Sequence, residues 1–535
     1  MKRPSQIPVL VVGGGPVGLA LANELGYRSV AYHLIDEGDG SVVFPAGEGI
    51  FARTMEHLRR WGLSEDLRNA SDFPPDQKRV IIFATRFEGQ ILARFDGLSN
   101  AEEPRLNPYS PEGGMFCPKK AFDPALRRGA ERRDLGRIAY CHRLLDFAQR
   151  DDHVLAQVED LTNGDVFTIE ASYLVGCDGA RSLVRRRLGI SYVGSFAEGH
   201  NFAIYFRAPK LRGELERRFG TMPTQLHMLN VEHRPYLVAV DGQELWRMSM
   251  YILADENPDA GATLNKILGP EIATEVLRAQ PWKGNRVVAE RYYRDRVFLA
   301  GDAVHLRWPK GGFGANTGIG DVVDLGWKLD AMLTGWGGPN LLDSYEAERR
   351  PIAVRNVNEA SNNRHLDAQI SPDTLLDETN ERGRAARQRV CEQYFALRLR
   401  EFRTAGVQLG YRYRHSPICV PDGSLEPPDD HMIYYPSTWP GSRAPHAWLE
   451  GGKSTLDLFG RGFVLLRFGK HLIADIERAA EHRSVPLQIV DIPHRQIRDL
   501  YERDLVLVRP DGHVAWRGNE LPEDCTALIN RIAGW

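Results

Sequence analysis

A glycine-rich segment near the N-terminus carries residues suited to phosphate chemistry. Gly13–Gly18 reads G-G-G-P-V-G and lies between the apolar run Ile7–Val12 and a helical apolar pattern. Glycines let the backbone turn tightly and approach a pyrophosphate, and the following helix offers free N–H groups and the positive end of its dipole. Asp36 ends the next apolar run, Val30–Ile35, where a carboxylate can bond to ribose hydroxyls. The pattern predicts a β-α-β unit that binds a dinucleotide.

The alternative for this first segment is an ordinary strand–helix turn, which would leave Asp36 unexplained. We therefore treat both the glycines and the two carboxylates after the second strand as cofactor ligands. The candidate residues are Gly13, Gly15, Pro16, Gly18, Asp36 and Glu37.

A second segment, Tyr173–Ser182, is an apolar strand that ends in Asp178-Gly179 and continues to Arg181. A turn capped by Asp178 alone is one interpretation. A cofactor contact is the other, and it makes Asp178 and Arg181 candidate cofactor-binding residues.

A third segment, Arg296–Gly318, combines a short buried strand with a second glycine run. Asp302 follows the strand directly, where ligand-facing residues of open α/β sheets gather. The glycine run leads into a helix whose start can stabilise negative charge on a bound ring. A second phosphate loop is the alternative. The candidate cofactor-binding residues are Asp302, Pro309, Gly312, Gly314, Ala315 and Asn316.

Two residues between Asp302 and the glycine run are candidates for catalysis, His305 and Trp308, and Pro309 is expected to shape the turn beside them. A purely structural hydrogen-bonding role is the alternative for His305. Tyr205, in the strand-rich region further upstream, is a fourth catalytic candidate.

The chain as a whole is long enough for two or three domains, with 535 residues. Strand patterns dominate from about residue 193 to 288. There Trp246, Met248 and Met250 alternate onto one face, and Arg247, Ser249 and Tyr251 onto the other. After about residue 405 the composition shifts to loops rich in proline and glycine, followed by new strand patterns, which predicts a separate C-terminal domain.

Charge and cysteine content exclude several classes of protein. The formal net charge is −3 and the pI about 6.6, which argues against a nucleic-acid partner or an anionic membrane surface. The six cysteines form no C-x-x-C pair, and no His/Cys cluster has zinc spacing, so no metal site is expected. Without a transmembrane pattern or a cleavage site, we expect a reduced, cytoplasmic protein.

The three segments resemble those of the FAD-dependent aromatic hydroxylases, the single-component class A flavoprotein monooxygenases. "FARTMEHLRRWGL" (51–63) and "GGFGANTGIGDVVDLGWKL" (311–329) are similar to further stretches of that family, and the former makes Arg53 a candidate cofactor-binding residue. "RPDGHVAWRG" (509–518) is similar to the end of phenol-hydroxylase-type members. Their C-terminal domain has a thioredoxin-like fold, but this chain lacks C-x-x-C, which excludes disulfide exchange.

The resemblance implies an α/β fold with a Rossmann-like FAD-binding domain of the glutathione-reductase type. It also implies an inserted β-sheet substrate domain and a thioredoxin-like C-terminal domain. The expected bounds are 1–78, 104–190 and 291–370 for the FAD-binding domain, 79–103 and 191–290 for the substrate domain, 371–404 for a helical connection, and 405–535 for the C-terminal domain.

Four positions depart from the family pattern. Pro45-Ala46-Gly47 stands where Pro-Arg-Ala is frequent, so an arginine near the pyrophosphate is missing. Lys119 stands where glutamine is frequent, and we expect it to replace part of that positive charge beside the FAD. Lys310 and Asp324 stand where threonine and asparagine are usual.

The resemblance also implies a reaction. NADPH or NADH, bound transiently, would reduce FAD, O₂ would add to form a C4a-hydroperoxide, and one oxygen atom would pass to a phenolic or polycyclic aromatic ring. A Baeyer–Villiger or epoxidising flavin enzyme on the same fold is an alternative. A flavin protein that shelters a reactive intermediate without turnover is another. A homodimer is expected from the resemblance alone.

Overall fold

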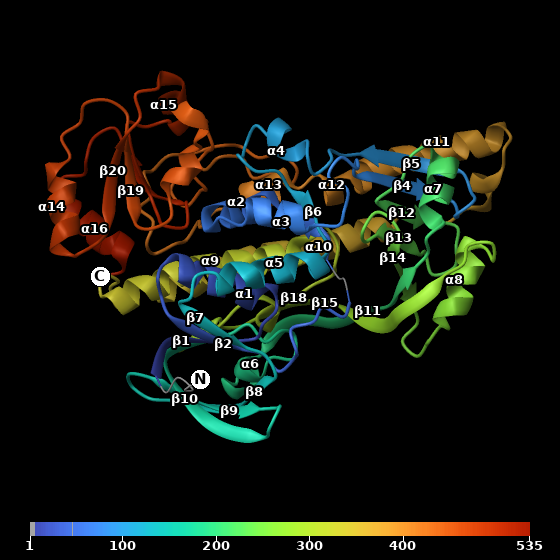
Figure 1. Cartoon of the computed structure of the whole chain (residues 1–535). Coiled ribbons are helices and arrows are strands. Elements are labelled where there is room, and N and C mark those ends of the chain that lie inside the picture. Colours follow the sequence, from blue (N-terminus) through green and yellow to red (C-terminus); the bar gives the residue numbers. More distant parts are fainter. Residues whose placement is uncertain (1–5, 45–46) are drawn as a thin grey trace.

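The computed structural model describes residues 6–44 and 47–535, which contain three large β-sheets and a two-stranded ladder (Figure 1). The departure at Pro45 and Ala46 lies outside the described residues. Two long helices, α9 (Phe313–Thr334) and α10 (Asp343–Ala368), run across the middle of the molecule. The C-terminal sheet, which contains β19 and β20, lies at one end of these helices, and the sheet that contains β12, β13 and β14 lies at the other (Figure 1).

The first sheet has a parallel core in the order β17-β10-β1-β2-β7. Its central strand β1 contains Val9, Leu10 and Val11, which are fully buried, as expected of a parallel strand covered on both faces. Helix α1 (Pro16–Tyr27) packs against α9 on one side and against α5 (Lys119–Glu131) on the other. The strands are β1 (Gln6–Val12), β2 (Tyr32–Ile35), β7 (Gly136–Ala139), β8 (His142–Gln149), β9 (Val154–Asp160), β10 (Asp165–Gly176), β16 (Tyr293–Arg294) and β17 (Val297–Leu299).

The second sheet has the order β18-β15-β11-β14-β13-β12-β4-β5 and is antiparallel except between β12 and β4. Trp246, Met248 and Met250 form a core on one face with α7 (Leu211–Phe219) and α8 (Ala260–Leu268), which confirms the predicted alternation. The strands are β4 (Val80–Ala84), β5 (Ile91–Asp96), β11 (Tyr192–Arg207), β12 (Gln225–Met228), β13 (Tyr236–Ala239), β14 (Leu245–Ile252), β15 (Glu275–Ala289) and β18 (His305–Leu306).

The third sheet has the order β20-β19-β21-β22 and lies in the C-terminal region. Strands β19 (Phe463–Arg467) and β20 (Leu487–Asp491) are parallel and joined through α14 (Ala474–His482). Strands β21 (Leu505–Val508) and β22 (Val514–Gly518) are antiparallel and lead to α16 (Cys525–Ala533). A βαβ unit followed by a ββα unit is the thioredoxin-like arrangement that the resemblance implied.

Further helices connect the three sheets. Helix α2 (Ala52–Trp61) lies between the first sheet's helices and the C-terminal region, and α11 (Glu381–Leu397) packs against β5. A two-stranded ladder pairs β3 (Gly49–Ile50) with β6 (Met115–Phe116). Within the described residues, no helix is both long and apolar enough to cross a membrane.

Candidate functional site

The first segment, Gly13–Gly18, and the second segment, Tyr173–Ser182, meet at the carboxyl ends of the adjacent parallel strands β1 and β10. Gly13 has a positive φ of 110°, and a Cβ atom there would collide with the carbonyl oxygen of Cys177. A Cβ atom on Gly18 would overlap the carbonyl oxygen of Gly13. Both positions therefore require glycine for packing, because strand, turn and helix approach within backbone contact.

The third segment joins the same place through Val17 on α1. A Cβ atom on Gly301 would lie 2.8 Å from a Val17 methyl carbon, and one on Gly318 of α9 would lie 2.6 Å from it. All three segments therefore meet at the carboxyl ends of β1, β10 and β17, a position termed the crevice from here on. This is where open α/β sheets bind their ligands.

Two helices begin at this crevice without side-chain caps. Gly15 is the N-cap of α1, and a Cβ atom there would meet no protein atom within 4 Å. Gly312 is the N-cap of α9, with a φ of 72°, and it too has no capping side chain. The free N–H groups of both helix starts therefore remain available to the phosphates or ring oxygens of a ligand.

Asp36 is held beside the first glycine turn. Its Oδ2 accepts a hydrogen bond from Gly14 N at 2.6 Å, and its Oδ1 accepts one from Gly38 N at 2.8 Å. Tyr140, just after β7, is a neighbour that the sequence reasoning missed, since its ring would lie 3.1 Å from a Cβ atom on Gly14. Glu37 is exposed beside Arg143, at 3.3 Å.

Asp178 offers an unsatisfied acceptor. Its Oδ2 accepts a hydrogen bond from Val184 N at 3.1 Å, but its Oδ1 is buried without a partner among the described residues. Burial raises the pKa of this carboxyl above its usual value. Arg181 lies close by on the exposed surface.

The turn that carries Asp302 is fixed by a residue that sequence reasoning missed. Asp321 on α9 accepts hydrogen bonds from Gly301 N at 3.2 Å and from Arg349 Nε at 2.9 Å. Burial alone would raise the pKa of Asp321, but His305 and Arg349 lower it below its usual value. Asp302 itself keeps an exposed side chain, 59% open. A carboxylate inside the apolar stretch GIGDVVDLGW was the available signal.

The ring of His305 is held within the protein, and its catalytic role stays a prediction. The ring is fully buried, its Nε2 lies 2.9 Å from Asp321 Oδ2, and its Nδ1 lies 2.8 Å from an Arg307 nitrogen. With both ring nitrogens engaged, His305 holds the Asp302 turn in place, in agreement with the structural alternative.

Trp308 and Pro309 lie at the junction of the two large sheets. Trp308 covers the backbone of Gly199 and Gly284, where a Cβ atom would lie 2.6 and 2.5 Å from its ring, and its Nε1 donates to Glu198 at 3.1 Å. It also packs in a cluster with Phe313, the first residue of α9. Pro309 is exposed. Their catalytic and cofactor roles stay predictions.

The second glycine run is tied to the segment before α2 by Asn316. Its Nδ2 donates to the carbonyl oxygens of Gly49 and Gly312 at 2.8 and 2.7 Å. Its Oδ1 accepts from Phe51 N at 2.9 Å and from Thr54 Oγ1 at 2.7 Å. Asn316 therefore fixes the loop that starts α9. Gly314 and Ala315 lie in the first turn of α9, directly after this loop, and are half-buried.

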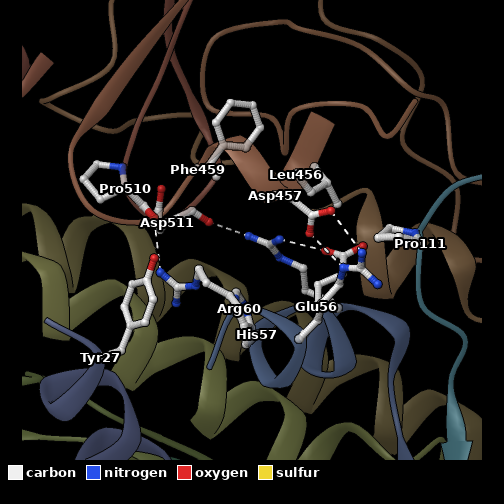
Figure 2. A pocket seen from close by; sticks show the side chains of 13 residues that line it. Tyr27, Glu56, His57, Arg60, Pro111, Leu456, Asp457, Phe459, Pro510 and Asp511 are labelled. Atoms are coloured by element: carbon white, nitrogen blue, oxygen red, sulfur yellow. Dashed lines mark hydrogen bonds and ion pairs between the residues drawn. The ribbon is translucent and has the colours of Figure 1, made fainter. Parts of the chain in front are cut away.

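The guanidinium of Arg53 is bonded on the side of α2 that meets the C-terminal region, and its role as a cofactor ligand stays a prediction. Its guanidinium donates to Glu56 at 2.8 Å and to the Asp511 carbonyl oxygen at 2.6 Å. It lines a cavity of about 230 Å³ between α2 and the C-terminal domain (Figure 2). Thr54, the next residue on α2, is the one bonded to Asn316. Consecutive residues of a helix are about 100° apart around its axis, so Arg53 and Thr54 lie on different faces.

Two further candidates have partners within the protein. Lys119 begins α5 and forms an ion pair with Asp123. Tyr205 is half-buried, and its ring contacts Phe44 with the centroids 6.2 Å apart. Their proposed contacts with FAD and substrate stay predictions.

A polar patch lies on the second sheet, on the face opposite the Trp246 core. The strand register sets Asn201 opposite Tyr251, Ala203 opposite Ser249, and Tyr205 opposite Arg247. Arg247 forms an ion pair at 2.6 Å with Glu48, two residues before Ile50. Tyr251 clusters with Phe51, Trp308 and Phe313 around the second glycine run. This face is therefore turned toward the crevice.

Comparisons with known proteins agree with this geometry. Residues 6–360 match the family described as "FAD binding domain", and residues 437–535 match "Aromatic-ring hydroxylase, C-terminal". The tetracenomycin A2 monooxygenase-dioxygenase of Streptomyces glaucescens is 32% identical over 98% of this chain and 95% of its own.

Two solved structures are similar over the whole chain. The rebeccamycin biosynthetic enzyme RebC with reduced flavin has a TM-score of 0.93 and 38% identity and covers 100% of both chains. Aklavinone-11 hydroxylase, solved with FAD and aklavinone, has a TM-score of 0.82 and 28% identity and also covers 100% of both chains.

The chain belongs to the FAD-dependent aromatic-ring hydroxylases, and it is an FAD-dependent monooxygenase. The residues present fit the cofactor, since two uncapped helix starts, an open position at Gly15 and an unpaired Asp178 oxygen surround one crevice. No group of His, Cys, Asp and Glu suited to a metal ion occurs in the described ranges.

Proposed function

We propose that the protein hydroxylates a phenolic or polycyclic aromatic compound, with NADPH or NADH as reductant and O₂ as co-substrate. The observation that carries this proposal is a crevice bounded by three glycine segments, with a polar, partly unpaired sheet face turned toward it. The aklavinone complex of a relative supports a polycyclic substrate of this kind.

The bound flavin would supply the electron transfer and the activation of O₂ that side chains cannot provide. We assign the ADP half to Gly13, Gly15, Gly18 and Asp36, and the ring to the loop that Asn316 fixes. The uncapped start of α9 supports this assignment, because its dipole favours negative charge on an adjacent ring.

The protein's own contribution is to orient the aromatic ring and keep water away from it. Tyr251, Trp308 and Phe313 supply an apolar cluster beside the second glycine run. Asn201 and Ser249 supply hydrogen-bonding groups on the facing sheet. Such a mixture of aromatic walls and a few convergent polar groups is typical of small-molecule sites.

The test is a panel of phenols and hydroxylated polycyclic aromatics given to the FAD-loaded protein. NAD(P)H oxidation should rise at least about 10-fold with a substrate, because the reductant is consumed in each productive turnover of the flavin. The product should gain one oxygen atom by mass. Bound flavin with no stimulated oxidation would reject the proposal and favour the sheltering alternative. Ring expansion or an epoxide would favour the other flavin chemistry.

We also propose that the protein works in the cytoplasm as a homodimer without nucleic-acid partners. All six cysteines are unpaired, which supports a reducing compartment. The small net charge of −3 supports the absence of a nucleic-acid partner. Light scattering coupled to size exclusion would test the dimer.

A further inference from the structure

Glu48 and Arg247 form an isolated ion pair between the flavin crevice and the substrate-facing sheet. An Arg247 guanidinium nitrogen lies 2.6 Å from Glu48 Oε1, and each side chain is only 11% exposed. Glu48 directly precedes Gly49, whose carbonyl oxygen is bonded to Asn316 of the glycine loop. Arg247 has no other ion pair in the described part of the chain. The pair therefore joins the loop that begins α9 to strand β14.

The polar atoms around this pair are incompletely satisfied. Asn201 Nδ2, Ser249 Oγ and Arg247 Nε are buried and have no hydrogen-bond partner within residues 6–44 and 47–535. Leaving such a group unpaired costs roughly 1–3 kcal/mol. Three unpaired groups on the same face of two adjacent strands point to a polar ligand that completes them.

The charge of this patch is set by Glu48. A buried arginine without a counter-charge would bind a ligand carboxylate in a bidentate manner. With Glu48 in place, an incoming carboxylate meets a like charge instead. A neutral hydroxyl group, in contrast, can donate to Glu48 while it accepts from Asn201 or Ser249.

We propose that Glu48 is a specificity-determining residue that neutralises Arg247, so that the site selects an uncharged, hydroxylated ring over a carboxylated one. This inference rests on the proposed function. It names the functional group that the substrate presents at this end of the site, a free ring hydroxyl, and it concerns a residue that neither the glycine motifs nor the flavin contacts involve.

The experiment compares Glu48→Gln with the parent in FAD-loaded protein. Binding of two matched pairs of probes is followed by the change in the flavin absorption spectrum: 2-naphthol against 3-hydroxy-2-naphthoate, and 1-hydroxyanthraquinone against its 2-carboxylate. Measurements at about pH 8 favour the ionised carboxylate, because burial raises the pKa of Glu48 above its usual value. The parent should favour the uncharged probe of each pair, and Glu48→Gln should shift the ratio of dissociation constants at least about 10-fold toward the carboxylate.

Two further variants complete the design. Arg247→Gln in the Glu48→Gln background should abolish the gain, because the gain requires a free guanidinium. Glu244→Gln removes one of the two carboxylate partners of Arg207, in an exposed ion pair next to the same sheet, and should leave the ratio unchanged. Flavin content confirms that each variant is folded.

An unchanged ratio in Glu48→Gln would overturn the inference, as would a failure of all four probes to perturb the flavin in both proteins, which would mean that only water completes the patch. The hydroxylation panel decides the proposed function separately. If a phenol is hydroxylated and the ratio does not move, the inference fails while the function stands. If no phenol is hydroxylated, the function fails whatever the probes do.

Discussion

Asp324 on α9 stands at a position where the family usually has asparagine, inside a buried cluster of charges. Its oxygens lie 2.7 Å from Lys328 Nζ and 3.0 Å from an Arg509 nitrogen. Glu348 and Asp511 contact the same arginine. Three carboxylates thus share two cations, an excess of negative charge that favours a proton on one of the carboxylates. Burial raises the pKa of Asp324 well above its usual value, whereas Arg509 and Lys328 outweigh burial and lower that of Glu348.

We predict that Asp324→Asn is neutral or stabilising at neutral pH, because an amide resembles a protonated carboxyl. Above about pH 4 the unfolded chain loses this proton while the folded protein keeps it, so the contribution of Asp324 to stability falls as pH rises. Asparagine removes that loss, and we expect a gain of about 1 kcal/mol at about pH 7.5. Urea denaturation of FAD-loaded protein at about pH 5 and 7.5 measures the difference.

Asp511→Asn is the matched control within the same cluster. Burial opposes ionisation of Asp511, but Arg509 and His513 lower its pKa well below the usual value, so it contributes as an anion. Asp511→Asn, which replaces this anion by a neutral amide, should therefore lower the denaturation midpoint at neutral pH. Equal losses from the two substitutions would contradict the assignment of the proton to Asp324.

At the scale of elements, the β1–α1 turn contains glycines required for two different reasons, close packing of the protein at Gly18 and room for the cofactor at Gly15. A Cβ atom on Gly18 would collide with the Gly13 carbonyl oxygen, so Gly18→Ala should destabilise the protein even without FAD. A Cβ atom on Gly15 meets no protein atom within 4 Å. We predict that Gly15→Ala leaves the melting temperature of the apoprotein within about 2 °C but weakens FAD binding at least about 10-fold.

Fluorescence titration with FAD and thermal melts of the apoproteins give the two readouts. Gly213→Ala, on the surface helix α7 with nothing near its Cβ position, is the control and should change neither. FAD binding by Gly15→Ala at parental strength would mean that this helix start does not approach the pyrophosphate.

The elements themselves were largely predictable, because their periodicity is local. The strand–turn–helix at 7–25 and the opposite faces of 246–251 follow from residue spacing alone. Partners across the chain were not predictable. The sequence around His305 does not contain Asp321, and that around Arg53 does not contain Asp511, so the bonds that these two side chains make within the protein could not be foreseen. Glu48 and Arg247 are 199 positions apart and escaped notice for the same reason.

At the scale of the whole molecule, buried side chains, not only surface contacts, join the C-terminal domain to the flavin domain. Arg509, from the loop after β21, is fully buried and bonds to Asp324 and Glu348 on α9 and α10. Trp327 of α9 and Trp336, two residues beyond its end, pack in one cluster with Phe463 of β19. Since α9 also begins at the flavin crevice, the domain stabilises the helix that carries the flavin loop (Figure 1).

We predict that Arg509→Met destabilises the entire chain and not only its C-terminal domain. The substitution leaves Glu348 and Asp511 buried with too little positive charge, a loss of about 3–5 kcal/mol. Because the arginine bonds to both domains, thermal unfolding should remain a single transition at a lower midpoint, with flavin released in the same step.

Arg509→Lys should rescue little, since one ammonium cannot replace a guanidinium that reaches three carboxylates. Arg467→Met breaks an exposed pair with Asp491 in the same domain and should shift the midpoint only slightly. Two separate transitions, or flavin retained after the C-terminal domain has melted, would show that the domain is an independent appendage.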